Sequence, residues 1–219
     1  MTATAHETGA SGPEPQSPGR RERKKQRTRD ALVSAAFTLF AEKGFDATTV
    51  EEIADAVDVS SRTFFRYFAS KEDVALTFQE EQTQAVVAAL LSRPADEPIM
   101  TALRATVVGI ARACENGELG FDPDRFECVL SMLSDSPALM AKSLERTQKK
   151  QNLMTRIIAQ RLGVDPATDL RPHVIASAAM AGFNAAADAM RHHPETFVSV
   201  SETVDQAFAI LEEGLNPDH

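Results

Sequence analysis

Three helix-start signals follow one another closely near the middle of the first hundred residues. Thr49 and Glu52 have the spacing of a capping box, in which each residue satisfies a backbone N–H group of the other. Ser60 or Ser61 can cap a second helix, and Ser70 can cap another. Two short helices joined by so tight a turn predict a helix-turn-helix.

The preceding segment, from about Arg27 to Gly44, has the pattern of a longer amphipathic helix. Its apolar residues recur at helical spacing: Leu32, Ala35, Ala36, Leu39 and Phe40. Gly44 stands where a left-handed C-terminal cap is expected. The helix that begins after Thr49 carries a matching apolar face, made of Val50, Ile53, Ala54 and Val57. These two helices can therefore share one small core.

Residues 61–68 mix aromatic and basic side chains, and a helical wheel separates the two kinds. The polar arc consists of Arg62, Thr63, Arg66 and Tyr67. Phe64 and Phe68 fall on the opposite side, as anchors. Phe65 lies at the border, where core packing is favoured over contact with a thymine methyl group. Arginines on the polar arc can bind guanine edges or phosphates through paired N–H donors.

Charge is divided unevenly along the chain, although the net value of −9 alone argues against a nucleic-acid partner. Residues 20–71 contain eleven Lys or Arg and eight Asp or Glu, whereas the rest contains twelve and twenty-four. Seven of the eleven cations lie in residues 20–29, which we expect to attract phosphate; a solvated flank without a partner is the alternative. Lys71 is poorly placed for the dipole of its predicted helix, which suggests that it binds an external anion.

Residues 27–75 resemble the TetR family of bacterial transcriptional regulators. The resemblance rests on "TTVEEIADAVDVSSRTFFRYFASKEDV" and on "LFAEKGFDATTV", which ends the first helix. It implies a homodimer in which each subunit inserts its third helix into the major groove of a palindromic operator of double-stranded DNA. It also implies which residues usually touch DNA: Thr49, Ser61, Arg62, Thr63, Phe65, Tyr67 and Lys71. Ser60 and Arg66 complete the predicted DNA-binding set.

Two positions depart from the family pattern. Asp58 stands in the turn where Gly is common, which puts the local backbone geometry in question and adds a negative charge. Phe65 stands where Tyr is common, so a hydroxyl that would bind phosphate is missing. Arg66 or Tyr67 is expected to supply that affinity instead.

The whole chain is predicted to be all-α. We expect a disordered tail at residues 1–19, a helix-turn-helix domain with a preceding basic arm at 20–75, and a larger effector-binding and dimerisation domain at 76–219. After a fourth helix, which ends near Leu91, further helices are predicted at residues 99–114, 123–133, 137–162, 172–191 and 198–215. Gly163 is expected to cap the longest of these.

The last two predicted helices are candidates for a subunit interface. Residues 173–190 are rich in Ala and nearly uncharged, yet Asn184, Asp188 and the scarcity of large side chains exclude a membrane span. Small residues allow helix backbones to approach closely, which favours a buried helix in a homodimer. The last helix can supply the other half of a four-helix seam through Val204, Phe208, Leu211 and Leu215. A wholly intramolecular core is the alternative.

A regulator of this class usually carries an internal pocket for a small molecule. The residues that can line an apolar cavity are Phe121, Phe126, Met132, Met140 and Phe183. Ordinary core packing is the competing interpretation for each of them. Arg104 and Arg125 can meet an acidic ligand, although solvated surface is favoured. We therefore expect an apolar or amphipathic effector.

The remaining features argue against other classes of protein. No apolar leader follows Met1, so we expect a cytoplasmic protein without a secretory signal. Cys114 and Cys128 lack the spacing of a zinc site or a disulfide framework and are expected to be buried apolar residues. Asp188, His192 and His193 lie close together, but at a helix end the histidines are expected to cap carbonyl groups or face solvent. No metal or cofactor is expected.

Three hypotheses of function follow. The favoured one is a ligand-responsive repressor, in which an effector changes the separation of two DNA-reading domains and lowers operator affinity. The second is an architectural or constitutive DNA-binding regulator with no effector. The third, an enzyme, lacks any P-loop, GxGxxG, GxSxG or HExxH motif, so no catalytic residue is assigned.

Overall fold

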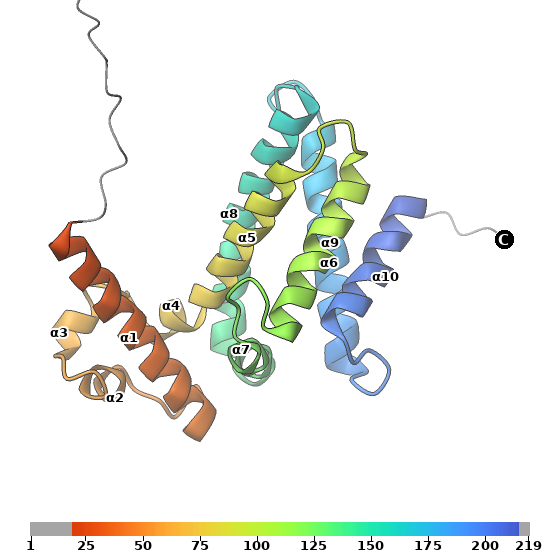
Figure 1. Cartoon of the computed structure of the whole chain (residues 1–219). Coiled ribbons are helices and arrows are strands. Elements are labelled where there is room, and N and C mark those ends of the chain that lie inside the picture. The colour runs from red at the N-terminus through yellow and green to blue at the C-terminus, as the bar shows by residue number, and fades with distance from the viewer. Residues whose placement is uncertain (1–18, 215–219) are drawn as a thin grey trace, which may run out of the picture.

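A computed structural model describes residues 19–214 and shows ten helices in that range (Figure 1). Their bounds are α1 Arg20–Lys43, α2 Val50–Asp55, α3 Ser61–Phe64, α4 Lys71–Ala75, α5 Thr77–Ser92, α6 Ile99–Asn116, α7 Pro123–Asp135, α8 Pro137–Leu162, α9 Arg171–His192 and α10 Val200–Glu213. Residues 19–214 contain no strand, so the predicted all-α fold is confirmed. The predicted tail lies outside the described residues, apart from Gly19.

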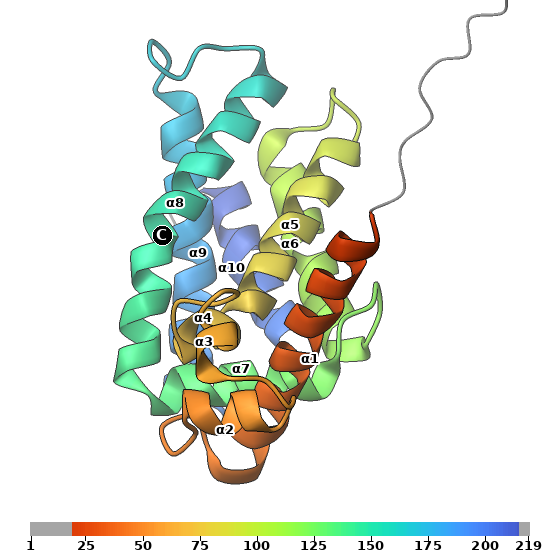
Figure 2. The same ribbon diagram turned by 90° about the vertical axis from the view of Figure 1, so that its left-hand side faces the viewer.

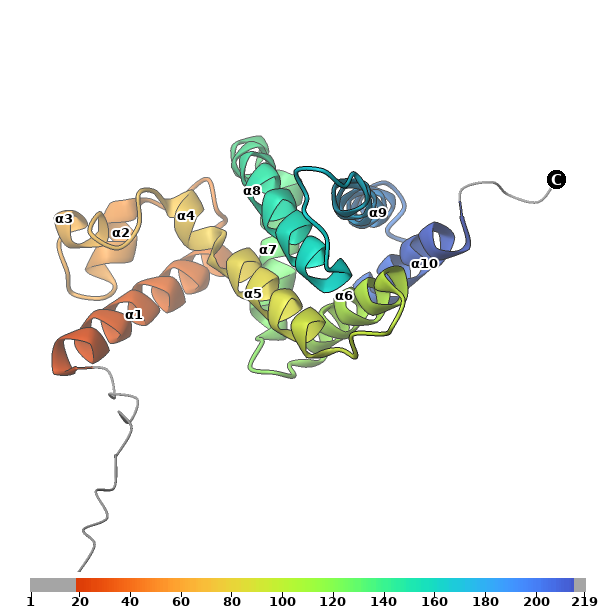
Figure 3. The same ribbon diagram turned by 90° about the horizontal axis from the view of Figure 1, so that it is seen from above.

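Helices α1, α2 and α3 form a small N-terminal unit, called the head below, at one side of the molecule (Figures 1 and 3). The predicted apolar faces meet in its interior, where Leu32, Phe40 and Ile53 are buried. Phe64 and Phe68 close this core from α3 and the turn after it. The predicted division of residues 61–68 into an anchoring and a presented side is therefore correct for these two rings.

The first helix is longer than its apolar pattern predicts. It begins at Arg20 rather than near Arg27, so most of the expected basic arm forms the opening turns of α1. Lys, Arg, Gln and Glu are good helix formers, and such residues extend a helix without any apolar residue to mark the extension. At the other end, Gly44 has a positive φ of 87° but an extended ψ of 158°, so the expected left-handed cap is wrong in detail.

The head shares its core with the second domain. One continuous cluster of buried residues contains Phe37 and Phe40 of α1, Phe78 of α5, and Phe126 and Met132 of α7. Figure 2 shows α7 passing beneath the bundle close to α1. The head therefore does not hang on a flexible linker, because its apolar face is completed by α5 and α7.

The second domain is a bundle in which α6 packs on α10, and α9 lies between α8 and α10 (Figures 1 and 3). Its own core cluster includes Leu103, Ile158, Ala176, Ala186 and Phe208. The bounds of α6 to α10 agree with the predicted ones to within two residues within the described range, because apolar periodicity and terminal residues mark these helices clearly. No helix in residues 19–214 has the length and apolar character needed to cross a membrane.

Two glycines of the second domain differ in what their backbone requires. Gly109 lies exposed in the interior of α6, and an added Cβ would meet nothing within 4 Å. Gly120, in the link before α7, has equally open surroundings but a φ of +83°. Only the second position needs the conformational freedom of glycine.

We expect Gly109→Ala to stabilise the protein by about 1 kcal/mol, because alanine restricts the unfolded chain and favours the helix. The melting temperature should rise by about 2–4 °C, measured by circular dichroism. Gly120→Ala is the matched control and should lower it, because an L-residue is strained at that φ. Equal shifts for the two variants would contradict this assignment.

Candidate nucleic-acid interface

The two helices of the helix-turn-helix are set by side-chain caps. Thr49 Oγ1 accepts from Glu52 N, and the Glu52 carboxylate accepts from Thr49 N at 2.9 Å, which confirms the predicted capping box. Hydrogen bonding to Lys43, which also forms an ion pair with Glu52, and to Thr49 lowers the pKa of Glu52 to about 2. Ser60, rather than Ser61, caps α3 by accepting from Thr63 N at 3.2 Å. The reciprocal bonds of Thr49 and Glu52 therefore fix the start of α2, and Ser60 fixes the start of α3.

The backbone of Asp58 shows how the turn forms without the glycine that is common at this position. Its φ is +54°, so an aspartate occupies the left-handed conformation that glycine usually supplies. Asp58 N donates to Asp55 O, and Val59 N donates to Ala54 O, both at 3.0 Å. This pair of bonds is the Schellman arrangement that ends a helix. The turn after α2 therefore forms a Schellman motif with Asp58 at its left-handed position.

The face presented by α3 and the following turn is partly aromatic. Arg62 and Arg66 are exposed, and Thr63 and Tyr67 are half-buried. Phe65 is 55% exposed, so the favoured expectation that it packs in the core is wrong. Its ring stands edge-on to the buried Phe64 at 5.5 Å and is held outward, where an apolar contact with DNA is possible.

The regular helix in this region is shorter than the predicted one, because α3 ends at Phe64 and residues 65–67 form a turn. Two helix-type bonds nevertheless continue through the segment, from Phe65 N to Ser61 O and from Phe68 N to Phe64 O. They keep the alternation of buried and exposed side chains close to helical. Ser61 and Thr63 both lie half-buried at its start.

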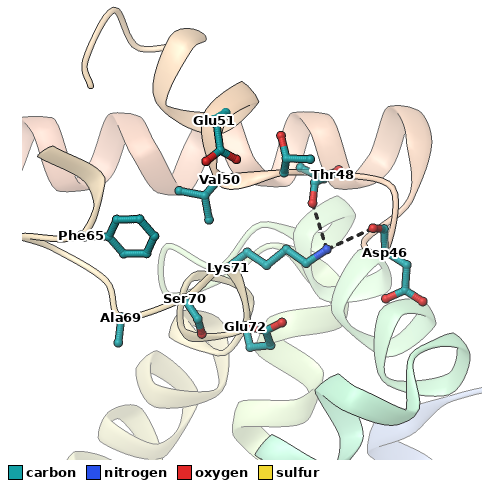
Figure 4. A pocket seen from close by; sticks show the side chains of 10 residues that line it. Asp46, Thr48, Val50, Glu51, Phe65, Ala69, Ser70, Lys71 and Glu72 are labelled. Atoms are coloured by element: carbon teal, nitrogen blue, oxygen red, sulfur yellow. Dashed lines mark hydrogen bonds between the residues drawn. The ribbon is translucent and has the colours of Figure 1, made fainter. Parts of the chain in front are cut away.

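Lys71 is not free, contrary to expectation. Its Nζ donates to three backbone carbonyl oxygens in the link between α1 and α2, those of Phe45 (2.8 Å), Thr48 (2.9 Å) and Asp46 (3.1 Å). The ammonium also lies 4.5 Å from the Phe45 ring centroid. Figure 4 shows the Lys71 side chain reaching the link between Asp46 and Thr48. Lys71 therefore clamps this link with all three of its donors, and its predicted contact with DNA remains a prediction.

An open depression surrounds this clamp and includes Thr49, Phe65 and Ser70 in its lining (Figure 4). Three carboxylates also line it, those of Asp46, Glu51 and Glu72. Because the Lys71 ammonium is already bound to carbonyl groups, the depression is poorly suited to a small anion. Its exposed aromatic ring and hydroxyls fit better as part of a broad contact surface.

The cations in the opening turns of α1 lie next to the surface formed by α3 and the turn that follows it. The side chains of residues 20–27 are exposed, and within residues 19–214 none of their cations forms an ion pair. Further along, the Arg29 guanidinium lies 5.1 Å from the Phe68 ring centroid. The segment is therefore a solvent-facing basic patch joined rigidly to the head.

Several contacts that the sequence does not predict attach the head and α4 to α8. Ser136 Oγ, at the start of α8, donates to Asp46 Oδ1 at 3.0 Å. Arg146 donates to Asp73, and Lys142 lies 3.4 Å from the same carboxylate. In the sequence, these contacts are indicated only by the recurrence of cations along one face of α8. The partners of Arg146 and Ser136 lie 73 and 90 residues away in the chain, so no local pattern reveals them.

The residues predicted to line a ligand cavity are not gathered at one place. Phe121, Phe126 and Met132 pack in or against the cluster shared with the head, Met140 is half-buried on α8, and Phe183 is 41% exposed on α9. The two arginines considered for an acidic ligand are also occupied. Arg104 pairs with Asp205 (2.7 Å) and Glu212 (3.0 Å), and Arg125 is packed between aromatic rings rather than solvated.

His192 lies at the end of α9, and the two cysteines lie on α6 and α7. His192 Nδ1 lies 2.8 Å from the carbonyl oxygen of Asp188, the capping arrangement expected for it. Residues 19–214 contain no group of three or more His, Cys, Asp or Glu side chains that could hold a metal ion. Cys114 is buried and Cys128 half-buried, both unpaired, and burial raises the pKa of both thiols.

Two family models match the sequence. "Bacterial regulatory proteins, tetR family" matches residues 32–77, and "MftR C-terminal domain" matches residues 97–216. The HTH-type transcriptional regulator TcmR of Streptomyces glaucescens is 40% identical over 176 residues, 80% of this chain and 78% of TcmR. The putative mycofactocin biosynthesis transcriptional regulator MftR of Mycobacterium tuberculosis is 26% identical over 198 residues, 89% of this chain and 94% of MftR.

Solved structures with low sequence identity share the fold. A putative TetR-family regulator from Syntrophomonas wolfei superposes with a TM-score of 0.59 at 18% identity, covering 88% of this chain and 98% of that one. A complex of SmeT with triclosan gives a TM-score of 0.56 at 17% identity, covering 84% and 91%. Taken with the capped helix-turn-helix and the identity to TcmR over most of both chains, the matches show that this protein belongs to the TetR family of bacterial transcriptional regulators.

Proposed function

We propose that this protein represses transcription by binding a palindromic operator as a homodimer in the cytoplasm, and that a small-molecule effector releases it. The proposed DNA binding is supported by one observation, the outward face of α3 and the turn that follows it. Arg62, Phe65 and Arg66 are exposed there, while Phe64 behind them is buried. Within residues 19–214 neither arginine forms an ion pair. Their N–H groups are therefore available for guanine edges or phosphates.

The basic turns of α1 support a second kind of DNA contact. Their cations are exposed and spread over more than one face of the helix, a distribution suited to the phosphate backbone rather than to individual bases. Because α1 is one continuous helix packed into the head, these charges move with α3 as a rigid unit. We infer that they raise affinity for any DNA sequence, whereas α3 selects the operator.

The outer face of α9 supports a homodimer. Val174, Ala181 and Ala185 are exposed and share one face of the helix by their spacing. Ile210 on the neighbouring α10 is 56% exposed. Exposed apolar side chains on two adjacent helices, with small alanines on α9, allow the same pair from a second subunit to pack against them. The last two helices are thus the proposed seam, as the sequence predicts.

Release by a small molecule rests on the family and on related proteins. The complex of SmeT with triclosan shows that a protein of this fold can bind a small apolar molecule, and SmeT is a repressor of a multidrug efflux pump. Members of the family are transcriptional regulators, so an enzymatic function is excluded here. The contacts between α8 and the head provide a route by which a ligand in the second domain can act on DNA binding.

We expect Arg62→Ala to abolish operator discrimination without unfolding the protein, because it removes a presented side chain and leaves the anchors in place. Binding should be compared between DNA flanking the protein's own gene and scrambled DNA at about 150 mM salt. Arg156→Ala, an exposed arginine of α8, is the matched control and should bind as the parent does. Unchanged discrimination in Arg62→Ala would contradict the assigned face, and non-selective binding by the parent protein would indicate an architectural role.

Neutralising Arg21, Arg23, Lys24 and Lys25 to Gln should weaken binding to both DNAs to a similar extent. Each phosphate that is no longer neutralised should reduce the slope of log affinity against log salt by about 0.9. Fluorescence anisotropy at a series of salt concentrations measures both effects. A weakening confined to operator DNA would show instead that this segment reads sequence.

The proposed seam predicts that Ala181→Glu converts the dimer into monomers, because a carboxylate from each subunit would be buried near its symmetry mate. Size-exclusion chromatography with light scattering measures the mass directly. Ala88→Glu, at an alanine on α5 that is also exposed, is the control and should leave the mass unchanged. A dimer that survives Ala181→Glu would place the subunit interface elsewhere.

A further inference from the structure

Helix α8 is the basic helix of an otherwise acidic domain. It carries six of the twelve Lys and Arg residues that lie outside residues 20–71, and a single acidic residue, Glu145. Lys142, Arg146 and Lys150 recur at intervals of four, so they lie on one face. That face is turned toward α4 and α5, because the hydrogen-bond partners of all three lie there.

The three cations are not equally compensated. Lys142 and Arg146 both face the carboxylate of Asp73. Lys150 has a single hydrogen bond, from its Nζ to the neutral Gln79 Oε1 at 3.2 Å. In residues 19–214 no carboxylate lies within 4 Å of this ammonium. An ammonium group carries three N–H donors, so Lys150 has two left to bind a further partner beside Gln79.

The electrostatic surroundings of Lys150 support this interpretation. Burial lowers the pKa of Lys150, and Arg146 one turn away lowers it further, whereas Glu80 raises it. Gln79 Oε1 is also shared, since it accepts a hydrogen bond from Ser143 Oγ at 3.1 Å. An anionic group that reached Lys150 would add a hydrogen bond in which donor and acceptor are both charged.

Beyond Lys150 the contact between α5 and α8 turns apolar. Val86 and Val87 of α5 and Leu153 and Met154 of α8 are half-buried. They pack at the edges of the two core clusters, Val86 against the one shared with the head and the other three against the bundle core. A polar, cationic end and an apolar continuation therefore lie next to each other between the same two helices, an arrangement that suits an amphipathic ligand.

We propose that Lys150, assisted by Arg146, binds the anionic group of an amphipathic effector between α5 and α8. This inference rests on the proposed release of DNA by an effector and specifies the chemical class of that effector as a carboxylate, sulfonate or comparable anion with an apolar body. Arg146 connects binding to α4, because an anion that engages its guanidinium competes with Asp73 in the first turn of that helix. Lys71, in the same turn, connects α4 to the head.

Two fluorescent probes of similar shape test the charge requirement: anionic 8-anilinonaphthalene-1-sulfonate and neutral N-phenyl-1-naphthylamine. Lys150→Met keeps the length of the side chain and removes its charge. It should raise the Kd of the sulfonate about ten-fold and change that of the neutral probe less than about two-fold. Lys149→Met, its exposed neighbour, is the matched control and should behave as the parent does. Lys150→Arg should retain sulfonate binding.

Several results would overturn the inference. These are equal sulfonate affinity in Lys150→Met and the parent, absence of saturable sulfonate binding by the parent, or parallel loss of both probes. Operator binding without any probe is measured on the same samples, and Lys150→Met should match the parent. Failure of the parent to select its operator would count against the proposed function, whereas the probe affinities judge the role of Lys150 independently of DNA.

Discussion

The placement of the head depends on one cation packed between two aromatic rings. The Arg125 guanidinium of α7 lies 4.4 Å from the ring centroid of Phe37 in α1 and 5.3 Å from that of Phe78 in α5. Its Nη2 donates to Thr77 Oγ1 at 2.7 Å, and Glu81 lies 3.3 Å away. Burial lowers the pKa of Arg125, yet an arginine remains charged in a protein. Three helices of both domains thus meet at a group that cannot lose its charge, so a displacement of α7 changes the packing of α1 directly.

A second set of contacts holds the other side of the head through α4. Lys71 clamps the link between α1 and α2, and Asp73, two residues later, is held by Arg146 of α8. Ser70, the cap of α4, accepts from Lys142 at 3.2 Å as well. The first turn of α4 is therefore tied to the head through one residue and to the second domain through two others. A short helix with opposing attachments at one end is well placed to transmit a small movement of α8 to the link before α2.

The parts of this structure that the sequence predicts depend on residues close together in the chain. The caps formed by Thr49 with Glu52 and by Ser60 and Ser70 involve partners three residues apart, and the sequence indicates all three. The expectation that Lys71 is free for an external anion is wrong because its acceptors are backbone carbonyls of a link 23 to 26 residues earlier, which no side-chain pattern reveals. The favoured prediction for Phe65 is wrong because its ring lies at the border of the helical wheel, where the wheel does not decide between the core and the exposed face. The predicted ligand residues share only their apolar character, and hydrophobicity alone cannot separate a shared core from a cavity.

The uneven distribution of charge along the chain indicates why an anionic effector would oppose DNA binding. The acidic second domain is expected to repel DNA and to leave the head free to approach it. Three of the six cations of α8, namely Lys142, Arg146 and Lys150, lie on the side facing α4 and α5. An anion bound there takes part of Arg146 from Asp73 and weakens the tie between α4 and α8. Coupling of this kind is reciprocal: if the anion lowers operator affinity by some factor, operator DNA must lower affinity for the anion by the same factor. In the proposed switch, DNA favours the arrangement in which Asp73 keeps Arg146, whereas the anion competes with Asp73 for that guanidinium. The two ligands therefore oppose each other although they never touch.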